Sequence, residues 1–330
     1  MFKLPFLLSK KEEFPNQFFA LDLGGKIFKI FLLEVDGQST KPLGFRKIAR
    51  EDSLDLSANA LADAVSDLKK DFPDVQTTAV VGVSGPHTLA FTTVVRSAVE
   101  RDQEELTSHA RAAALDSAEK ELRESLGDPK LNVLELEAEI LEVKEMEKLE
   151  VYLFTSFATS PYLDEQQELV KRARLSLWGF SSLPFNLVSE LSDTSADGEK
   201  LNTLIFDVGG TKTEVSLVFG GELMETKSFF WEFSENVNPT VFLDLWLGAV
   251  SSTLGAFEGV ETFPAKIFLS GGAAAFPGLV EAASSYPWAQ DHPFEIAPEV
   301  TLLEADRLPL SLGQVALRVK EINDSNESSV

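Results

Sequence analysis

The chain has 330 residues, and its 29 Lys and Arg against 53 Asp and Glu give a formal net charge of −24. Because proteins bind nucleic acid mainly through cations that displace counterions from phosphates, this charge argues against a nucleic-acid ligand. Cysteine is absent and histidine is rare, which excludes disulfides and thiolate metal sites and fits a cytoplasmic protein. At about 100 to 200 residues per domain, the length predicts two domains or one domain built from two similar halves.

The N-terminal segment 1–11, MFKLPFLLSKK, combines apolar side chains with lysines. It is too short to span a membrane and lacks the small-residue cleavage site of a signal peptide. Its composition fits either a simple terminal tail or a segment that lies at the surface of an anionic membrane. We therefore treat peripheral contact with the inner face of the cell membrane as a hypothesis for this segment.

The first half of the chain begins with two predicted strands over 18–23 and 27–35, joined by the Gly-Gly-Lys turn at 24–26. A helix is predicted over 53–70, where apolar residues recur at helical spacing. A buried strand over 77–85 follows and ends in a glycine turn.

A change in composition from Glu100 onward indicates an inserted unit. Leucine and alanine recur at every fourth position over 106–126, which predicts a long helix. Two strand-like runs at 131–143 and 148–157 follow, and a second helix is predicted over 164–178. We interpret the whole as a small α+β unit inserted into the first half.

The second half opens with a repeat of the first. Residues 203–221 have the same pattern as 18–37, namely an apolar run, Asp, one residue, Gly-Gly and a second apolar run, so we predict an internal duplication. A helix is predicted to begin at Asn238-Pro239, and a last strand at 265–272. The predicted organisation is a tail at 1–17, a first lobe at 18–98, the insert at 99–185, a second lobe at 186–320 and a disordered tail at 321–330.

Three glycine turns carry the candidate chemistry. A strand that ends in Asp and turns through Gly-Gly lets backbone N–H groups approach a phosphate, and the Asp can hold Mg²⁺ through water against the phosphate oxygens. One such turn is more often a plain hairpin, so the prediction depends on the repeat and on a third turn suited to an adenosine. The predicted nucleotide-binding residues are Asp22, Gly24, Gly25, Lys26, Asp207, Gly209, Gly210, Thr211, Thr213, Ser270, Gly271 and Gly272, with Asp22 and Asp207 as the magnesium ligands.

Three segments resemble, in chain order, the phosphate-1, phosphate-2 and adenosine motifs of the actin-like ATPases. They are LDLGGKIFKIFLLE at 21–34, IFDVGGTKTEVSLV at 205–218 and IFLSGGAAAFPGL at 267–279. The resemblance covers most of the chain and implies an α/β, actin-like (ribonuclease H-like) fold of two lobes. It further implies that ATP and Mg²⁺ bind in the cleft between the lobes, with slow or no hydrolysis.

Within this superfamily, VVGVSGPHTLAFTTVVR at 80–96 and the insert that follows are similar to the FtsA family of bacterial cell-division proteins. The PilM family of pilus-assembly proteins is similar in the same places. An FtsA-like scaffold would bind the C-terminal tail of a tubulin-like division protein and could self-associate. A PilM-like scaffold would bind a short N-terminal tail of an inner-membrane pilus protein. The segment 80–96 and the long helix after it favour the division role.

Several departures from the family pattern limit what the resemblance implies. Lys26 replaces the usual Thr or Ser, so a hydroxyl donor is lost and a point charge for phosphate is gained. The interval 221–265 is too short for a complete subdomain, which predicts a reduced second small subdomain. Glu190 is the only candidate for polarising the attacking water. The polar tail at 321–330 cannot bury an apolar face in a membrane, which leaves segment 1–11 as the candidate for that contact.

A small-molecule kinase of the same fold is the alternative from another functional class. DVGGTK at 207–212 resembles the sugar-kinase form of the turn. A kinase also needs an Asp base for the sugar hydroxyl, and kinases with this turn often carry a cysteine-rich zinc motif that is absent here. The kinase turn normally lies near the N-terminus, so the scaffold interpretation is favoured.

Overall fold

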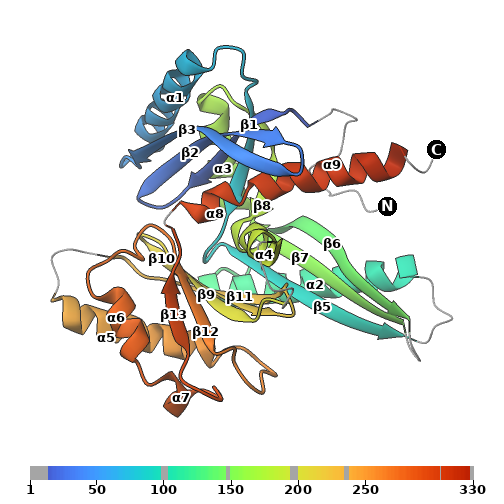
Figure 1. The fold of residues 1–330 in the computed structure, drawn as a ribbon, viewed down its shortest axis with the longest axis vertical. Coiled ribbons are helices and arrows are strands. Elements are labelled where there is room, and N and C mark those ends of the chain that lie inside the picture. The colour runs from blue at the N-terminus through green and yellow to red at the C-terminus, as the bar shows by residue number, and fades with distance from the viewer. Residues whose placement is uncertain are drawn as a thin grey trace.

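The computed structural model describes residues 14–97, 103–145, 149–193, 200–233, 238–304 and 306–327. Two sheets, one above the other in Figure 1, form the cores of two lobes, and the insert extends sideways from the lower one. The N-terminal segment 1–11 lies outside the described residues. Within the described ranges, no helix is long and apolar enough to cross a membrane.

The first lobe is built on a five-stranded sheet in the order β3-β2-β1-β4-β8. Strands β1 to β3 form an antiparallel meander, and β4 and β8 run parallel to β1. Alternate residues of β1 face opposite sides, so that Phe19 packs toward α1 and α3 while Phe18 packs toward α4 (Leu183–Asp193) and α9 (Gly313–Glu327). The elements are β1 (Gln17–Leu23), β2 (Ile27–Asp36), β3 (Ser39–Ala49), α1 (Leu54–Asp71), β4 (Thr78–Val83), α3 (Ser160–Arg172) and β8 (Ser176–Ser182).

The second lobe repeats this topology, which confirms the predicted duplication. Its strands are ordered β11-β10-β9-β12-β13, with two antiparallel pairs on one side of β9 and two parallel pairs on the other. As predicted, Asn238 caps the helix that Pro239 begins, and its side chain accepts a hydrogen bond from Thr240 N at 3.0 Å. The elements are β9 (Thr203–Val208), β10 (Lys212–Phe219), β11 (Glu222–Phe230), α5 (Pro239–Leu254), β12 (Lys266–Ser270), α6 (Leu279–Ser285), α7 (Trp288–Asp291) and β13 (Glu299–Leu302).

The insert extends the sheet of the second lobe, although it lies in the first half of the sequence (Figure 1). Its strand β5 joins β11 through one register pair, Phe91 with Glu225, and Thr92 Oγ1 donates to the Leu223 carbonyl at 2.6 Å. The eight-stranded sheet therefore continues β11-β5-β7-β6. The elements of the insert are β5 (Thr88–Ser97), α2 (Gln103–Leu126), β6 (Val133–Glu145) and β7 (Leu149–Thr159).

The elements at both ends of the predicted insert, 99–185, pack differently from the prediction: β5, predicted in the first lobe, pairs with β7 and β11, whereas α3 and β8 pack in the first lobe. The helix predicted over 164–178 ends at Arg172 because Arg174 adopts a left-handed backbone conformation with φ of 58°. Leu177, predicted to lie on that helix, belongs instead to β8, which pairs with β4 in the first lobe. Helix α3 also packs in the core of the first lobe, so the insert ends with β7.

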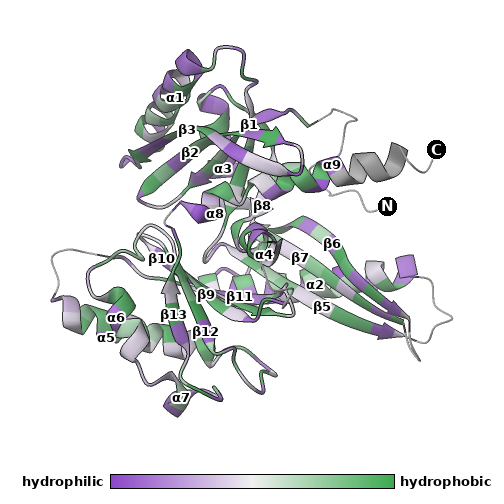
Figure 2. Cartoon of the chain, viewed as in Figure 1, coloured by the Kyte–Doolittle hydropathy of each residue, from purple (hydrophilic) through white to green (hydrophobic). Residues whose placement is uncertain are grey.

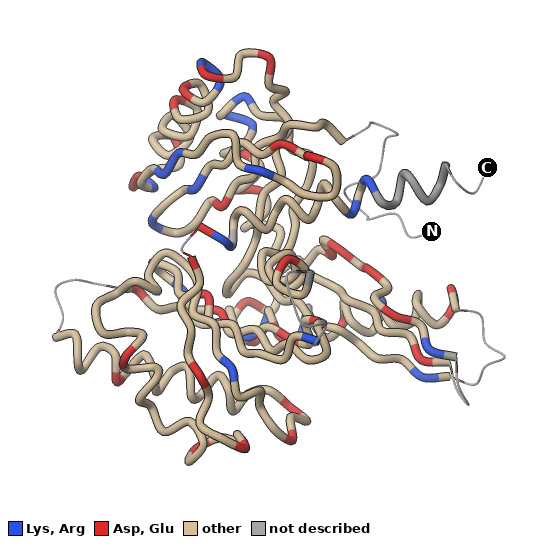
Figure 3. Tube along the Cα trace, in the orientation of Figure 1, with Lys and Arg blue, Asp and Glu red and all other residues tan. Residues whose placement is uncertain are grey.

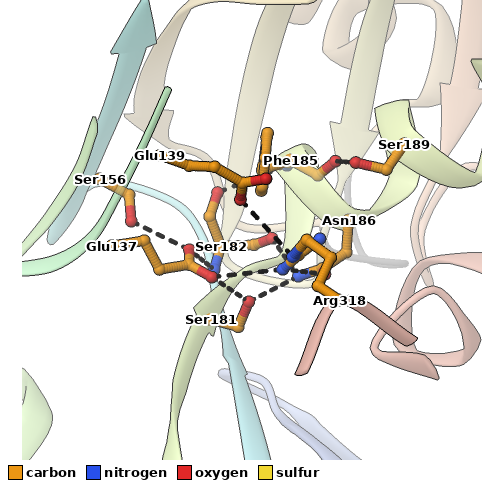
Figure 4. A network of polar contacts seen from close by, with 9 residues as sticks. All are labelled: Glu137, Glu139, Ser156, Ser181, Ser182, Phe185, Asn186, Ser189 and Arg318. Atoms are coloured by element: carbon orange, nitrogen blue, oxygen red, sulfur yellow. Dashed lines mark hydrogen bonds and ion pairs between the residues drawn. The ribbon is translucent and has the colours of Figure 1, made fainter. Parts of the chain in front are cut away.

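A buried polar network fixes the insert against the rest of the molecule (Figure 4). Glu137 of β6 is 2% exposed and accepts hydrogen bonds from Ser181 Oγ at 2.5 Å and Ser182 N at 2.8 Å. Arg318 of α9 (Gly313–Glu327) lies 3.5 Å from Glu137 and donates to Asn186 Oδ1 at 3.0 Å. The network thus joins the insert, the start of α4 (Leu183–Asp193) and the C-terminal helix.

Two further expectations concern the second half of the chain. The described residues of the interval 221–265 form β11 and α5, which pack in the core of the second lobe, and this confirms the reduced second small subdomain. Helix α9 continues the chain after the short α8 (Arg307–Leu310) and runs to Glu327, beyond the point where disorder was predicted. A helix whose first turns are already packed adds residues at low cost, which composition does not reveal.

Hydropathy and charge are distributed differently over this fold. Apolar residues are concentrated on the strands and on the inner faces of the helices (Figure 2), in agreement with the buried clusters on both faces of the first sheet. Acidic residues are spread over both lobes and the insert (Figure 3). The negative charge is therefore a property of the whole surface rather than of one element.

Candidate functional site

A cavity of about 480 Å³ lies between the two lobes and brings the three predicted turns together. The first turn follows β1, the second follows β9 and the third follows β12, and the carboxyl ends of these strands meet at the cavity. The predicted residues that line it are Asp22, Gly24, Gly25, Lys26, Asp207, Gly209, Gly210, Thr211, Gly271 and Gly272. The structure adds Ile27, Lys29, Ser84, Lys212, Phe233 and Ala273 to this lining.

The two phosphate-type turns touch each other directly. A Cβ atom added to Gly25 would overlap the Thr211 side chain, and one added to Gly210 would lie 3.0 Å from Lys26. Glycine at position 25 is therefore needed for the lobes to approach as well as for access to a ligand, whereas a Cβ atom at position 210 would require only a small shift of the Lys26 side chain. Sequence reasoning predicted only the second of these reasons.

The third turn has a similar packing requirement. Gly271 has φ of +96°, and an added Cβ atom would lie 2.5 Å from the Val208 carbonyl oxygen, which belongs to the second turn. Gly272 faces open space, since a Cβ atom there would meet nothing within 4 Å. Gly271 is thus required by the fold, whereas Gly272 leaves room for a ligand at the surface of the cavity.

The strand register places different residues beside the two aspartates. Asp22 lies opposite Lys29 on β2, and at the equivalent position of the second lobe Asp207 lies opposite Glu214 on β10. The Lys29 ammonium is buried and lies 3.6 Å from Asp306 Oδ1. The duplicated frame therefore places a cation beside one aspartate and a carboxylate beside the other.

The charges around Asp22 act in opposite directions. Burial raises the pKa of the Asp22 carboxyl above its usual range, while Lys29 and Lys212 lower it. Asp207 and Asp306 add to the rise in the pKa of Asp22, because nearby negative charges disfavour its ionised form. A divalent cation between these carboxylates would relieve this repulsion.

Lys212 and Lys26 both bridge the lobes at the cavity. Lys212 Nζ donates to the carbonyl oxygen of Ser84 at 2.5 Å and to its hydroxyl at 2.6 Å. Lys26 Nζ donates to the Phe233 carbonyl oxygen at 2.8 Å and forms an ion pair with Glu232 at 3.0 Å. Each ammonium group thus lies at the cavity wall and contacts oxygens of the opposite lobe.

Glu214 lies behind the second turn and is almost completely buried, at 1% exposure. Its Oε2 accepts a hydrogen bond from Gly85 N at 2.5 Å. Burial raises the pKa of Glu214 from its ordinary 4.5 to about 7, with Asp207 adding to the rise and Lys212 and the Gly85 N–H opposing it. Its charge state therefore changes near neutral pH.

Three predicted site residues do not line the cavity. Thr213 is fully buried, and its Oγ1 accepts from Trp246 Nε1 at 3.0 Å, so this hydroxyl supports the core of the second lobe. Ser270 is also fully buried, one residue before the turn. Glu190 lies on α4 and pairs with Arg307 at 3.2 Å. Alternation along β10 explains Thr213, since it points to the opposite face from Lys212 and Glu214.

The residues that sequence reasoning missed did leave signals. Lys29 is a single cation inside an apolar strand, which is unusual for a buried position. Ser84-Gly85 follows the buried strand β4, and Gly271 follows Ser270, the last residue of β12; both glycines have positive φ. The sequence indicated a glycine turn at the end of 77–85, and a comparison of the two halves beyond the first repeat would also have assigned this fourth turn to the site.

The residues present fit a magnesium–phosphate ligand. In the described part of the chain, no group of three or more His, Cys, Asp or Glu side chains could hold a metal alone. Asp22 and Asp207 both line the cavity, and Mg²⁺ is usually bound by one or two carboxylates together with substrate phosphates and water. The donor set therefore suits a metal that arrives with its phosphate ligand.

Comparison with known proteins gives structural matches. No protein-family model matches the chain, and no curated protein matches its sequence. A solved structure described as a PilM–PilN type IV pilus biogenesis complex matches with a TM-score of 0.63 at 16% identity, over 92% of this chain and 99% of that chain. The ethanolamine utilization protein EutJ from Carboxydothermus hydrogenoformans matches with a TM-score of 0.49 at 10% identity, over 92% of this chain and 90% of its own. With its duplicated five-stranded sheets and an insert, the chain has the fold of the actin-like ATPases.

Proposed function

We propose that the chain is an actin-fold scaffold of the PilM kind, which holds Mg-ATP between its lobes and binds the tail peptide of a membrane-associated partner. The observation that carries the nucleotide part is that all three glycine turns meet at one cavity. Three lysines and two aspartates line this cavity, which brings cations suited to phosphate beside carboxylates suited to Mg²⁺. This combination of groups favours a phosphate ligand that carries a divalent cation.

The lining residues divide by chemistry into three groups. Asp22 and Asp207 would hold Mg²⁺, which would screen the phosphate charges when bound. Lys26, Lys29 and Lys212 would bind phosphate oxygens as point charges. The turn that contains Gly272 leaves an open surface for the adenosine. This assignment uses all three turns that meet in the cavity.

Slow or absent hydrolysis is part of the proposal. Among the described residues that line the cavity, the carboxylates are the two aspartates that would hold the metal. Glu190, the candidate for polarising water, pairs with Arg307 away from this lining. Such a site can bind Mg-ATP, but its wall offers no further carboxylate to activate the attacking water. This suits a protein that binds nucleotide and hydrolyses it slowly or not at all.

For the biological role, we propose pilus-type assembly rather than the cell-division role that the sequence favoured. The match with a TM-score of 0.63 is to a complex of PilM with PilN, which supports a protein partner for this fold. By analogy, the partner would be a short N-terminal tail of an inner-membrane pilus protein. A pull-down against that tail and against the C-terminal tail of a tubulin-like division protein separates the two roles.

Calorimetry with Mg-ATP tests the nucleotide site. Asp22→Ala and Asp207→Ala should each weaken binding about tenfold or more, because each removes a carboxylate from the metal. Glu190→Gln is the matched control, since its carboxylate lies outside the cavity and the affinity should not change. Unchanged affinity in both aspartate variants would remove the nucleotide from the proposal.

Membrane contact through segment 1–11 remains a separate proposal. Its support is the composition of that segment, which offers lysines and apolar side chains in an otherwise acidic chain. Co-sedimentation with anionic liposomes should be lost when residues 1–11 are deleted. Co-sedimentation that survives the deletion would refute this contact.

A further inference from the structure

Strand β10 holds the loop of residues 84–88, here called the coupling loop, by two adjacent contacts. Lys212 Nζ donates to Ser84 O at 2.5 Å and to Ser84 Oγ at 2.6 Å. Two residues further along the same face of β10, Glu214 accepts a hydrogen bond from Gly85 N at 2.5 Å. The second lobe therefore contacts the first lobe through Lys212 and Ser84, which both line the proposed nucleotide cavity.

The far end of the coupling loop leads directly into the insert. Thr88 is the first residue of β5, and its N–H donates to the Gly85 carbonyl at 2.8 Å. Thr159 N, at the end of β7, donates to the His87 carbonyl at 3.0 Å. Pro86 and Thr88 also line a second cavity of about 410 Å³ between α2, β11 and α5. A movement of the loop would change both the start of the insert and the wall of this cavity.

Lys212 belongs to both the nucleotide cavity and the coupling loop. It lines the cavity, and a Cβ atom added to Gly85 would lie 2.8 Å from its Nζ, so the loop backbone packs directly on the ammonium group. Its present acceptors are a neutral carbonyl and a neutral hydroxyl. A phosphate in the cavity would offer this ammonium group a full negative charge as well as hydrogen-bond acceptors, so it would compete for Lys212 with the neutral oxygens of Ser84.

We propose that the contact between Lys212 and Ser84 is a ligand-sensing latch. Without ligand, the Lys212 ammonium group holds Ser84 through its two hydrogen bonds. A phosphate bound in the cavity draws the ammonium group away from Ser84, and the coupling loop is released. This inference rests on the proposed nucleotide binding. It names the residues through which nucleotide binding would be transmitted to the insert. Because the contact with Ser84 competes with the ligand, it lowers the apparent affinity for nucleotide. By reciprocity, anything that holds the insert in its released position would tighten nucleotide binding.

The test combines one substitution with hydrogen–deuterium exchange. Ser84→Ala removes one of the two acceptors of Lys212, so Mg-ATP should bind about three- to tenfold tighter by calorimetry, since one hydrogen bond to a charged group is lost from the empty state. In the wild type, Mg-ATP should increase amide exchange in a peptide covering 84–90, although ligands normally protect their surroundings. In the variant, exchange in that peptide should be raised without ligand.

Two further variants separate the latch from a general effect. Lys212→Met should weaken Mg-ATP binding and also raise exchange of 84–90 without ligand, because it removes both contacts of the ammonium group. Ser117→Ala, on the exposed surface of α2, removes a serine hydroxyl elsewhere and should change neither measurement. Thermal unfolding of each variant shows whether it has kept the fold.

The outcomes distinguish a failure of the proposed nucleotide binding from a failure of the latch alone. If the wild type does not bind Mg-ATP, the nucleotide function fails and the latch fails with it. If the wild type binds but Ser84→Ala binds equally or more weakly, the latch is refuted while nucleotide binding stands. The latch is also refuted if Mg-ATP leaves the exchange of 84–90 unchanged or reduces it.

Discussion

Replacement of Glu214 by Gln tests whether a buried acid behind the second turn titrates near neutral pH. Glu214 is 1% exposed, and burial raises its pKa from 4.5 to about 7. Gln has almost the same shape, and its amide oxygen can still accept the hydrogen bond from Gly85 N. The substitution therefore removes the titration while the packing and the loop contact remain.

The sign and size of the effect follow from the shift in pKa. Since the folded state raises the pKa, Glu214 stabilises the fold below about pH 4.5, where it is protonated in both states, and this contribution is lost as pH rises through 7. A shift from 4.5 to about 7, at about 1.4 kcal/mol per pKa unit, corresponds to about 3 kcal/mol. The free energy of unfolding of the wild type should therefore fall by about that amount relative to Glu214→Gln between pH 4.5 and pH 8.

Urea unfolding of both proteins at pH 5, 6, 7 and 8 measures this difference directly, because every other titrating group is shared. Ser117→Ala, at an exposed position of α2, is the control because it removes no titrating group, and its difference from the wild type should not vary with pH. If the difference in unfolding free energy between the wild type and Glu214→Gln does not change between pH 5 and pH 8, the pKa of Glu214 is not raised in the folded state.

The remaining predictions concern the third turn and the polar network. Gly271→Ala should destabilise the fold by at least about 2 kcal/mol, because it combines positive φ with overlap at the Val208 carbonyl, whereas Gly272→Ala should leave thermal stability unchanged. Arg318→Met should lower the free energy of unfolding by about 3 to 5 kcal/mol, because it leaves Glu137 buried without its cation. Adding Glu137→Gln to Arg318→Met should restore part of this lost stability, as measured by urea unfolding. Equal stability of the two glycine variants, or additive effects of Arg318→Met and Glu137→Gln, would contradict these arguments.

Local patterns predicted much of the fold. The two strands on either side of Gly24-Gly25 and their repeat at Gly209-Gly210 were found because strand propensity and glycine turns are short-range properties. The start of α5 at Asn238-Pro239 was found for the same reason. The end of α3 was not, because the left-handed conformation of Arg174 carries no glycine to mark it.

The composition of the cavity was partly predictable, and the role of each residue in it was not. Asp22 and Asp207 could be assigned to one site because the duplicated pattern implies equivalent positions on two facing lobes. The assignment of Thr213 as a phosphate donor was not supported, since the face of β10 on which it lies depends on the exact start of the strand. Glu190 could not be judged without knowing that Arg307 lies beside it.

The sequence by itself determined the two similar halves, the three glycine turns and the acidic charge, because these are encoded in composition and in neighbouring residues. Only the tertiary structure decided that the insert joins the sheet of the second lobe, and that Lys212 of one lobe holds Ser84 of the other. The physical reason is that the pairing of sheet edges and the hydrogen bonds between residues far apart in the chain depend on the relative placement of whole elements, which no local pattern specifies.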